Sequence, residues 1–410
     1  MNRGFYTILA AQFFSALADN ALLFAAIALL ASVNAQAWQT PVLQQFFVFA
    51  YIVLAPFVGP FADSLPKGRV MFVSNAVKLL GCIAMLMGMH PLLAYGLVGV
   101  GAAMYSPAKY GILTEYLPHQ KLVLANGWME GLTVAAIILG SILGGIMVSN
   151  KFADYVFARA DFPLIETGID TPPELAITVI LVFYFIAALI NLYIPKVAID
   201  HKLQKRNPVF IMQDFWHSFR LLWRDPLGQV SLAVTTLFWG VGATLRLIVL
   251  TWASMALKFN LETATQLTAV VAVGIALGSV LAAKYVSLKR AVRVLPVGIA
   301  MGLLVVTMVF VSDWRIAIVL LVLIGAMGGY FVVPINALLQ HRGHLLMGAG
   351  HSIAVQNFNE NLSILVLLGI YALMIKIDVP IEAIIITFGL FIAAAMAYLT
   401  RKHWHDQDRT

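Results

Sequence analysis

The chain has 410 residues, of which 61% are apolar and only 11% are charged, whereas about a quarter of the residues in an ordinary soluble domain are charged. This composition excludes a soluble globular protein and indicates an integral membrane protein. The single cysteine, Cys82, excludes an intrachain disulfide framework or a cysteine-based metal cluster. The net charge is +7, and the basic residues lie in short segments between apolar runs, which favours membrane topology over nucleic-acid binding as their explanation.

Apolar runs long enough to cross a membrane recur along the whole chain. A spanning helix needs about 20 residues, and the first run exceeds the roughly 7–15 residues of a signal-peptide core, so we expect it to be retained as a span. The sequence predicts twelve spanning helices, at residues 5–31, 43–62, 70–89, 91–113, 122–148, 173–195, 228–257, 263–284, 293–312, 315–339, 348–376 and 379–400.

The Lys and Arg residues of the short loops predict the orientation. When the spans alternate, most of these residues fall on one side, which the positive-inside rule identifies as the cytoplasm. Both termini are therefore expected in the cytoplasm. The outer loop 149–172 is acidic, and the sequence assigns it no role.

The longest inner segment, 196–227, divides the chain into an N-terminal six-helix bundle, 1–195, and a C-terminal bundle with a short cytoplasmic tail, 228–410. Aromatic residues recur within this segment at helical spacing, which suits an amphipathic helix lying on anionic headgroups. A plain tether between the two bundles explains the segment equally well.

The two halves of the chain show a weak internal sequence repeat. Pro107 in the fourth span and Pro334 in the tenth each lie six residues after a glycine, and NGWMEGL of the fifth span aligns with QNFNENL of the eleventh, which pairs Glu130 with Glu360. Parallel repeats of this kind are typical of transporters that bind their substrate between the halves, near the membrane midplane.

Four ionisable residues lie inside apolar spans: Asp19, Lys109, Arg246 and Glu360. A charge near the bilayer centre costs at least ~2.5–3.5 kcal/mol on insertion scales, so such residues mark substrate, ion or gating sites by default. Asp19 and Arg246 lie at comparable depths in equivalent spans and could meet. They would form either an ion pair that locks the halves together or a headgroup site, with a cation at Asp19 and a phosphate at Arg246.

The remaining polar residues of the spans extend this candidate site. Glu360 lies in a polar run that must line water or protein rather than lipid. For Glu130 and Lys109, nearer the inner side, a salt bridge at the cytoplasmic gate is as good an explanation as a substrate role, and Lys78 is expected to extend to the membrane surface. The candidate substrate-binding residues are Asp19, Asn20, Lys109, Arg246, Asn357 and Glu360.

Two further motifs bear on transport. The loop GPFADSLPKGR resembles the Gly-x-x-x-Asp and Gly-Arg loop of the major facilitator superfamily, although it is two residues longer. It predicts Asp63, Lys67 and Arg69, with Glu130, as gating residues that latch one conformation; positive-inside anchoring is the alternative. Glycines of the fifth and eighth spans predict close helix packing; they are Gly140, Gly144, Gly145, Gly274 and Gly278.

Several longer blocks carry a more specific resemblance: ADNALLFAAIALL, APFVGPFADSLPKGRVMF, GVGAAMYSPAKYGIL, LANGWMEG, TLFWGVGATLRL, GGYFVVPINALLQ and AVQNFNEN. Across nearly all twelve spans the chain resembles the bacterial lysophospholipid transporter family within the major facilitator superfamily. The resemblance implies the major facilitator fold, an all-α integral membrane protein with twelve transmembrane helices in two six-helix pseudo-repeats. By their matching motifs, Asp19, Arg246, Glu360 and Lys109 fall on the family's polar cavity positions.

The resemblance also implies a function. It predicts a flippase of the Gram-negative inner membrane, without cofactor, metal or enzymatic activity, that moves lysophosphatidylethanolamine and lysophosphatidylglycerol to the inner leaflet for re-acylation. The implied partner is the acyltransferase/acyl-carrier-protein synthetase Aas. Two alternatives stay open: a proton-coupled multidrug or metabolite antiporter, since GSILGG resembles the antiporter motif with Ser141 in place of a proline, and a non-transporting scaffold that positions a lipid enzyme.

Overall fold

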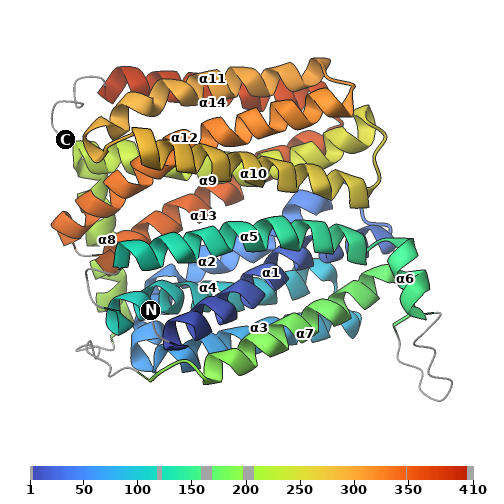
Figure 1. Ribbon diagram of the computed structural model, residues 1–410, viewed down its shortest axis with the longest axis horizontal. Helices are drawn as coiled ribbons and strands as arrows, with labels where there is room; N and C mark the ends of the chain where they lie inside the picture. The colour runs from blue at the N-terminus through green and yellow to red at the C-terminus, as the bar shows by residue number, and fades with distance from the viewer. Residues whose placement is uncertain (1–2, 118–121, 158–168, 197–206, 348, 404–410) are drawn as a thin grey trace. The chain divides into compact units, whose positions relative to one another are not determined.

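The computed structural model describes residues 3–117, 122–157, 169–196, 207–347 and 349–403. These residues form helices joined by short turns, and none of them is in a strand (Figure 1). Helix contacts divide the chain into two compact units. Unit 1 comprises Met1–Gln204 with Asn260–Ala269, and unit 2 comprises Lys205–Phe259 with Val270–Thr410.

Unit 1 is built around its first helix. Its helices are α1 (Arg3–Ser32), α2 (Gln39–Ser64), α3 (Lys67–Leu86), α4 (Pro91–Tyr116), α5 (Leu122–Met147), α6 (Asn150–Phe157) and α7 (Pro172–Leu192). Helix α1 packs against α5 and α7, α3 packs against α4 and α7, and α2 packs against α4. Most of α1 is buried, including its polar residues Gln12 and Ser15.

Unit 2 contains the remaining long helices: α8 (Pro208–Arg224), α9 (Pro226–Ala256), most of α10 (Leu261–Tyr285), α11 (Leu295–Val306), α12 (Trp314–Met347), α13 (Ala349–Lys376) and α14 (Ile381–His403). Helix α9 packs against α12, α13 and α14, and α11 packs against α12 and α14. Prolines occupy the first turn of α8 and α9, where no backbone N–H is needed, and Asn207 and Asp225 cap these helices.

Each of the twelve predicted spans has a helical counterpart. Ten helices in the described ranges are long and apolar enough to cross a membrane, and α5 with the bent α6 would make an eleventh if the pair forms one span. The all-α membrane fold is therefore confirmed. Helix α8 joins unit 2 by its contacts, while the predicted boundaries at residues 195 and 227 stay predictions.

The predicted glycine contacts are confirmed. A Cβ atom on Gly140 of α5 would lie 2.8 Å from the carbonyl oxygen of Leu17 on α1, and Gly144 meets α1 in the same way one turn later. Gly274 and Gly278 of α10 lie directly against the backbone of α12. Small residues at these positions let neighbouring helix backbones touch.

Candidate functional site

Asp19 and Lys78 form a buried ion pair inside unit 1. The Nζ atom of Lys78 on α3 donates to both carboxylate oxygens of Asp19 on α1, at 2.8 Å each. The lysine side chain is 1% exposed, whereas the aspartate side chain is 26% exposed. The carboxylate is thus the accessible member of the pair, and the ammonium lies behind it.

Further polar and aromatic groups surround this pair. Tyr184 of α7 donates its hydroxyl to Asp19 Oδ1 at 2.7 Å, and Lys78 also donates to Ser15 Oγ at 3.0 Å. The Lys78 ammonium lies 4.9 Å from the ring centroid of Tyr105 on α4 and 5.4 Å from that of Tyr184. Hydrogen bonds and aromatic rings both stabilise an ammonium group at this position, and α1, α3, α4 and α7 together hold the ion pair.

The prediction that Lys78 extends to the membrane surface is wrong. A lysine near the end of a span can extend to water, but Lys78 lies 11 residues into α3, about 17 Å from its start at 1.5 Å per residue. The depth of Lys78 within a largely apolar span was the sequence signal for a buried partner. The same reasoning had already identified Asp19.

Lys109 and Lys67 hold neighbouring helices together elsewhere in unit 1. Lys109 of α4 is 8% exposed, and its Nζ donates to Thr133 Oγ1 of α5 at 3.3 Å. Lys67 is 5% exposed and donates to the carbonyl oxygen of Ala62 near the end of α2 at 2.9 Å. Both ammonium groups thus bridge to another helix.

The other candidate residues of unit 1 differ in their surroundings. Asn20 donates its side-chain amide to the carbonyl oxygen of Ala16 at 2.8 Å, within α1. Arg69 is exposed at the start of α3. The side chains of Asp63 and Glu130 lie outside the described residues, so their predicted gating roles stay predictions.

Glu360 lies in a hydrogen-bonded polar cluster inside unit 2. Its side chain is 8% exposed, and Gln356 donates to Glu360 Oε1 at 2.8 Å and to Asn336 Oδ1 of α12 at 2.9 Å. Asn361 donates to the carbonyl oxygen of Asn357 at 2.8 Å. The polar run of α13 therefore faces protein in part, as its composition predicts.

Helix α8 covers the neighbouring part of α13. Trp223 donates its indole N–H to Asn359 Oδ1 at 3.2 Å. Phe358 lies 5.4–6.1 Å, between ring centroids, from the aromatic rings of Phe215, Trp216 and Phe219. Aromatic residues of α8 thus pack on the helix that carries Glu360. The two predicted roles of this segment, an interfacial helix or a tether between the bundles, stay predictions.

Arg246 lies on α9 in unit 2 and is partly buried, whereas Asp19 lies in unit 1. The structure describes the two units separately, so the predicted meeting of these charges stays a prediction. The ionic partner that the structure assigns to Asp19 is Lys78, within its own unit.

A further ion pair in unit 2 was missed by the sequence reasoning. Asp225 caps α9 by accepting from the Gly228 backbone N–H at 2.7 Å, and it pairs with Arg342 near the end of α12. Burial by itself would raise the pKa of Asp225, but the hydrogen bonds from Arg342 and Gly228 outweigh burial and lower the pKa below its usual 3.8. The pair fastens the start of α9 to α12.

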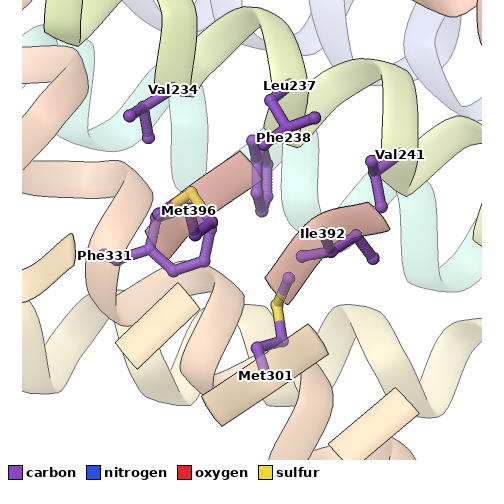
Figure 2. Close-up of a pocket in the computed structure, with 8 residues that line it drawn as sticks. All are labelled: Val234, Leu237, Phe238, Val241, Met301, Phe331, Ile392 and Met396. Atoms are coloured by element: carbon purple, nitrogen blue, oxygen red, sulfur yellow. The ribbon is translucent and has the colours of Figure 1, made fainter. Parts of the chain in front are cut away.

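Unit 2 also contains a purely apolar pocket (Figure 2). It has about 200 Å³ of empty space, part of it open to the surroundings, and is lined by Val234, Leu237, Phe238, Val241, Met301, Phe331, Ile392 and Met396. No lining side chain carries a charge or a strong hydrogen-bonding group, so this pocket cannot recognise a polar headgroup.

Comparisons with known proteins agree with this architecture. A model of the Major Facilitator Superfamily matches residues 8–368. The lysophospholipid transporter LplT of Yersinia enterocolitica serotype O:8 / biotype 1B is 45% identical over 384 residues, which cover 93% of this chain and 90% of that protein. LplT of Yersinia pestis strain Pestoides F is 45% identical over 385 residues, covering 94% and 90%.

Two solved structures share the fold. A bacterial homologue of the human lysosomal transporter Spinster has a TM-score of 0.68 at 14% identity and covers 99% of both chains. The major facilitator transporter FucP has a TM-score of 0.66 at 14% identity and covers 97% of both. The resemblance in the sequence blocks is thus confirmed: the chain belongs to the major facilitator superfamily and, within it, to the lysophospholipid transporter family LplT.

Proposed function

We propose that the protein is a flippase that moves lysophosphatidylethanolamine and lysophosphatidylglycerol across the inner membrane of a bacterium. One observation supports this most: proteins that are 45% identical over 93% of the chain are named lysophospholipid transporters. The lipids move to the inner leaflet, where they are re-acylated. The protein has no catalytic role of its own and needs no cofactor.

The chemistry of a lysophospholipid fits the buried charges. Its headgroup carries a phosphodiester, in some cases with an amine, and needs polar partners inside the membrane, while its single acyl chain can stay in lipid. Arg246 binds the phosphate because a guanidinium matches phosphate oxygens bidentately. Asp19 and Glu360 accept hydrogen bonds from the far end of the headgroup. Asn20, Lys109 and Asn357 supply further polar contacts.

The mechanism we propose is alternating access of the two halves, with the lipid entering sideways between helices so that its tail never leaves an apolar environment. Asp63, Lys67, Arg69 and Glu130 form the inner gate. Lys67 supports this assignment because its buried ammonium already bridges to the end of α2.

The cellular setting follows from the same proposal. Both termini lie in the cytoplasm, as the positions of the Lys and Arg residues predict. The functional partner is the acyltransferase/acyl-carrier-protein synthetase Aas, which consumes the lipid at the inner leaflet. Because this reaction removes the transported lipid, movement down its gradient needs neither nucleotide nor an obligatory ion gradient.

Flipping of labelled lysophosphatidylethanolamine in proteoliposomes, with and without an imposed pH gradient, tests the proposal. We expect flipping in both conditions. Strict dependence on the gradient would favour the proton-coupled antiporter, and no flipping in either condition would refute the flippase and favour the scaffold. An Arg246→Ala variant that retains full flipping would refute the phosphate role of Arg246 alone.

A further inference from the structure

The ion pair of Asp19 with Lys78 has a consequence for headgroup selection. Only Asp19 offers accessible surface, at 26% of its side chain, while Lys78 is 1% exposed. A headgroup that reaches this cluster therefore meets the carboxylate first. The ammonium behind it lies within 2.8 Å of both carboxylate oxygens, close enough to cancel most of the negative charge that the headgroup experiences.

The surroundings hold the Lys78 ammonium in place. The two oxygens of Asp19 and the hydroxyl of Ser15 occupy the three N–H donors of the ammonium. The rings of Tyr105 and Tyr184, at 4.9 and 5.4 Å, stabilise the cation further. The pair therefore carries no net charge, and it is fixed by four helices.

The carboxylate nevertheless keeps acceptor capacity. An ionised carboxylate has about four acceptor positions, and Lys78 and Tyr184 use three of them. Asp19 can accept one more hydrogen bond, from an ammonium or from a hydroxyl. A neutral pair that still accepts a hydrogen bond recognises a donor without selecting for its charge.

We propose that Lys78 is a specificity-determining residue: by neutralising Asp19 it lets one site accept lysophospholipids with a zwitterionic, amine-bearing headgroup and with an anionic, hydroxyl-bearing headgroup. This inference rests on the proposed function and deepens it. Without Lys78, the bare carboxylate would attract the amine and repel the anionic lipid. Without Asp19, the bare ammonium would do the reverse.

The test is the ratio of flipping rates for lysophosphatidylethanolamine and lysophosphatidylglycerol in proteoliposomes. In Lys78→Met we expect this ratio to rise about tenfold or more, since an uncompensated charge beside the headgroup discriminates strongly. In Asp19→Asn we expect it to fall by a similar factor. The double variant, which restores neutrality, should return to within about threefold of the wild-type ratio.

Two controls separate charge from folding. Lys402→Met removes an exposed positive charge from α14 and should leave the ratio unchanged. This control shows whether the loss of any positive charge alters the ratio by changing how much anionic lipid gathers near the protein. Lys78→Arg keeps the charge and should keep the ratio. Asp19→Asn leaves a buried ammonium without its counter-ion. If this variant does not fold, the ratios of flipping rates in Lys78→Met and in the double variant still test the inference, because the second substitution should cancel the effect of the first.

The outcomes are distinct. Opposite shifts in the single variants, cancelled in the double variant, support the inference, because a purely structural ion pair would lower both rates equally and leave their ratio unchanged. A wild-type ratio in an active Lys78→Met variant would overturn the inference but not the flippase. Flipping of neither lipid by the wild type would overturn the proposed function, and this inference with it.

Discussion

Replacing Gly140 with alanine tests how closely α5 must approach α1 to hold Asp19 in place. The new Cβ atom would lie 2.7 Å from Asn20 Cβ and 2.8 Å from the carbonyl oxygen of Leu17. These atoms belong to α1 itself and cannot rotate away. The helices must therefore separate by about 0.6–0.7 Å to reach an ordinary van der Waals contact near 3.4 Å.

The expected cost follows from this displacement. Overpacking a close contact typically costs ~1–3 kcal/mol. A comparable shift of the adjacent Asp19 would lengthen its 2.8 Å hydrogen bonds to Lys78 beyond the roughly 3.2 Å limit of a good N–H···O contact. We therefore expect both lower stability and slower flipping.

Gly131→Ala is the matched control, because Gly131 lies on the same helix and its added Cβ would face open space, with no atom of a neighbouring helix within 4 Å. Both variants gain the same helix propensity, so their difference isolates the packing cost. The assay is the midpoint of SDS-induced unfolding in mixed micelles, where Gly140→Ala should be less stable than Gly131→Ala by about 1–3 kcal/mol. Equal midpoints would refute the close contact between α1 and α5.

Two further predictions concern unit 2. Asp225→Asn keeps the helix cap but removes the charge that pairs with Arg342, and should lower the free energy of unfolding at pH 7 by about 0.5–1 kcal/mol. Because the pKa of Asp225 is lowered in the folded protein, the difference between variant and wild type should vanish as the pH falls well below 3.8. A difference that does not change with pH would contradict the ion pair. Trp223→Phe leaves Asn359 Oδ1 without its donor and should lower the free energy of unfolding by about 1 kcal/mol. The control is Trp239→Phe, at an exposed tryptophan. Equal unfolding midpoints for the two variants would argue against this hydrogen bond.

The helices were predictable because every span must meet the same physical requirement, an apolar stretch long enough to cross the membrane. About 20 apolar residues are needed to cross the hydrocarbon. The charged turn at Asp313 marks the start of α12, where the Asp313 side chain accepts a hydrogen bond from the backbone N–H of Arg315 at 2.8 Å. The close-packing glycines were predictable for a similar reason, because their spacing of four residues places them on one helix face.

The partners of the buried charges were less predictable. Asp19 and Lys78 are 59 residues apart in sequence, and an apolar run does not reveal which of its faces turns toward another helix. Asp19 was recognised as a functional candidate from its depth, whereas Lys78, at similar depth, was assigned to the surface because lysine side chains are long enough to reach it. The aromatic contacts between α8 and Phe358 were hidden for the same reason: the pattern identified an apolar helix face but not what covers it.

The proposed flipping of lysophospholipids can be measured directly as the transbilayer movement of lysophosphatidylethanolamine by the purified protein. The liposomes carry no imposed gradient, and two-chain phosphatidylethanolamine is the comparison. We expect the protein to accelerate movement of the one-chain lipid and to leave the two-chain lipid at the rate of protein-free liposomes. Equal rates for the one-chain lipid with and without protein would contradict the proposed function.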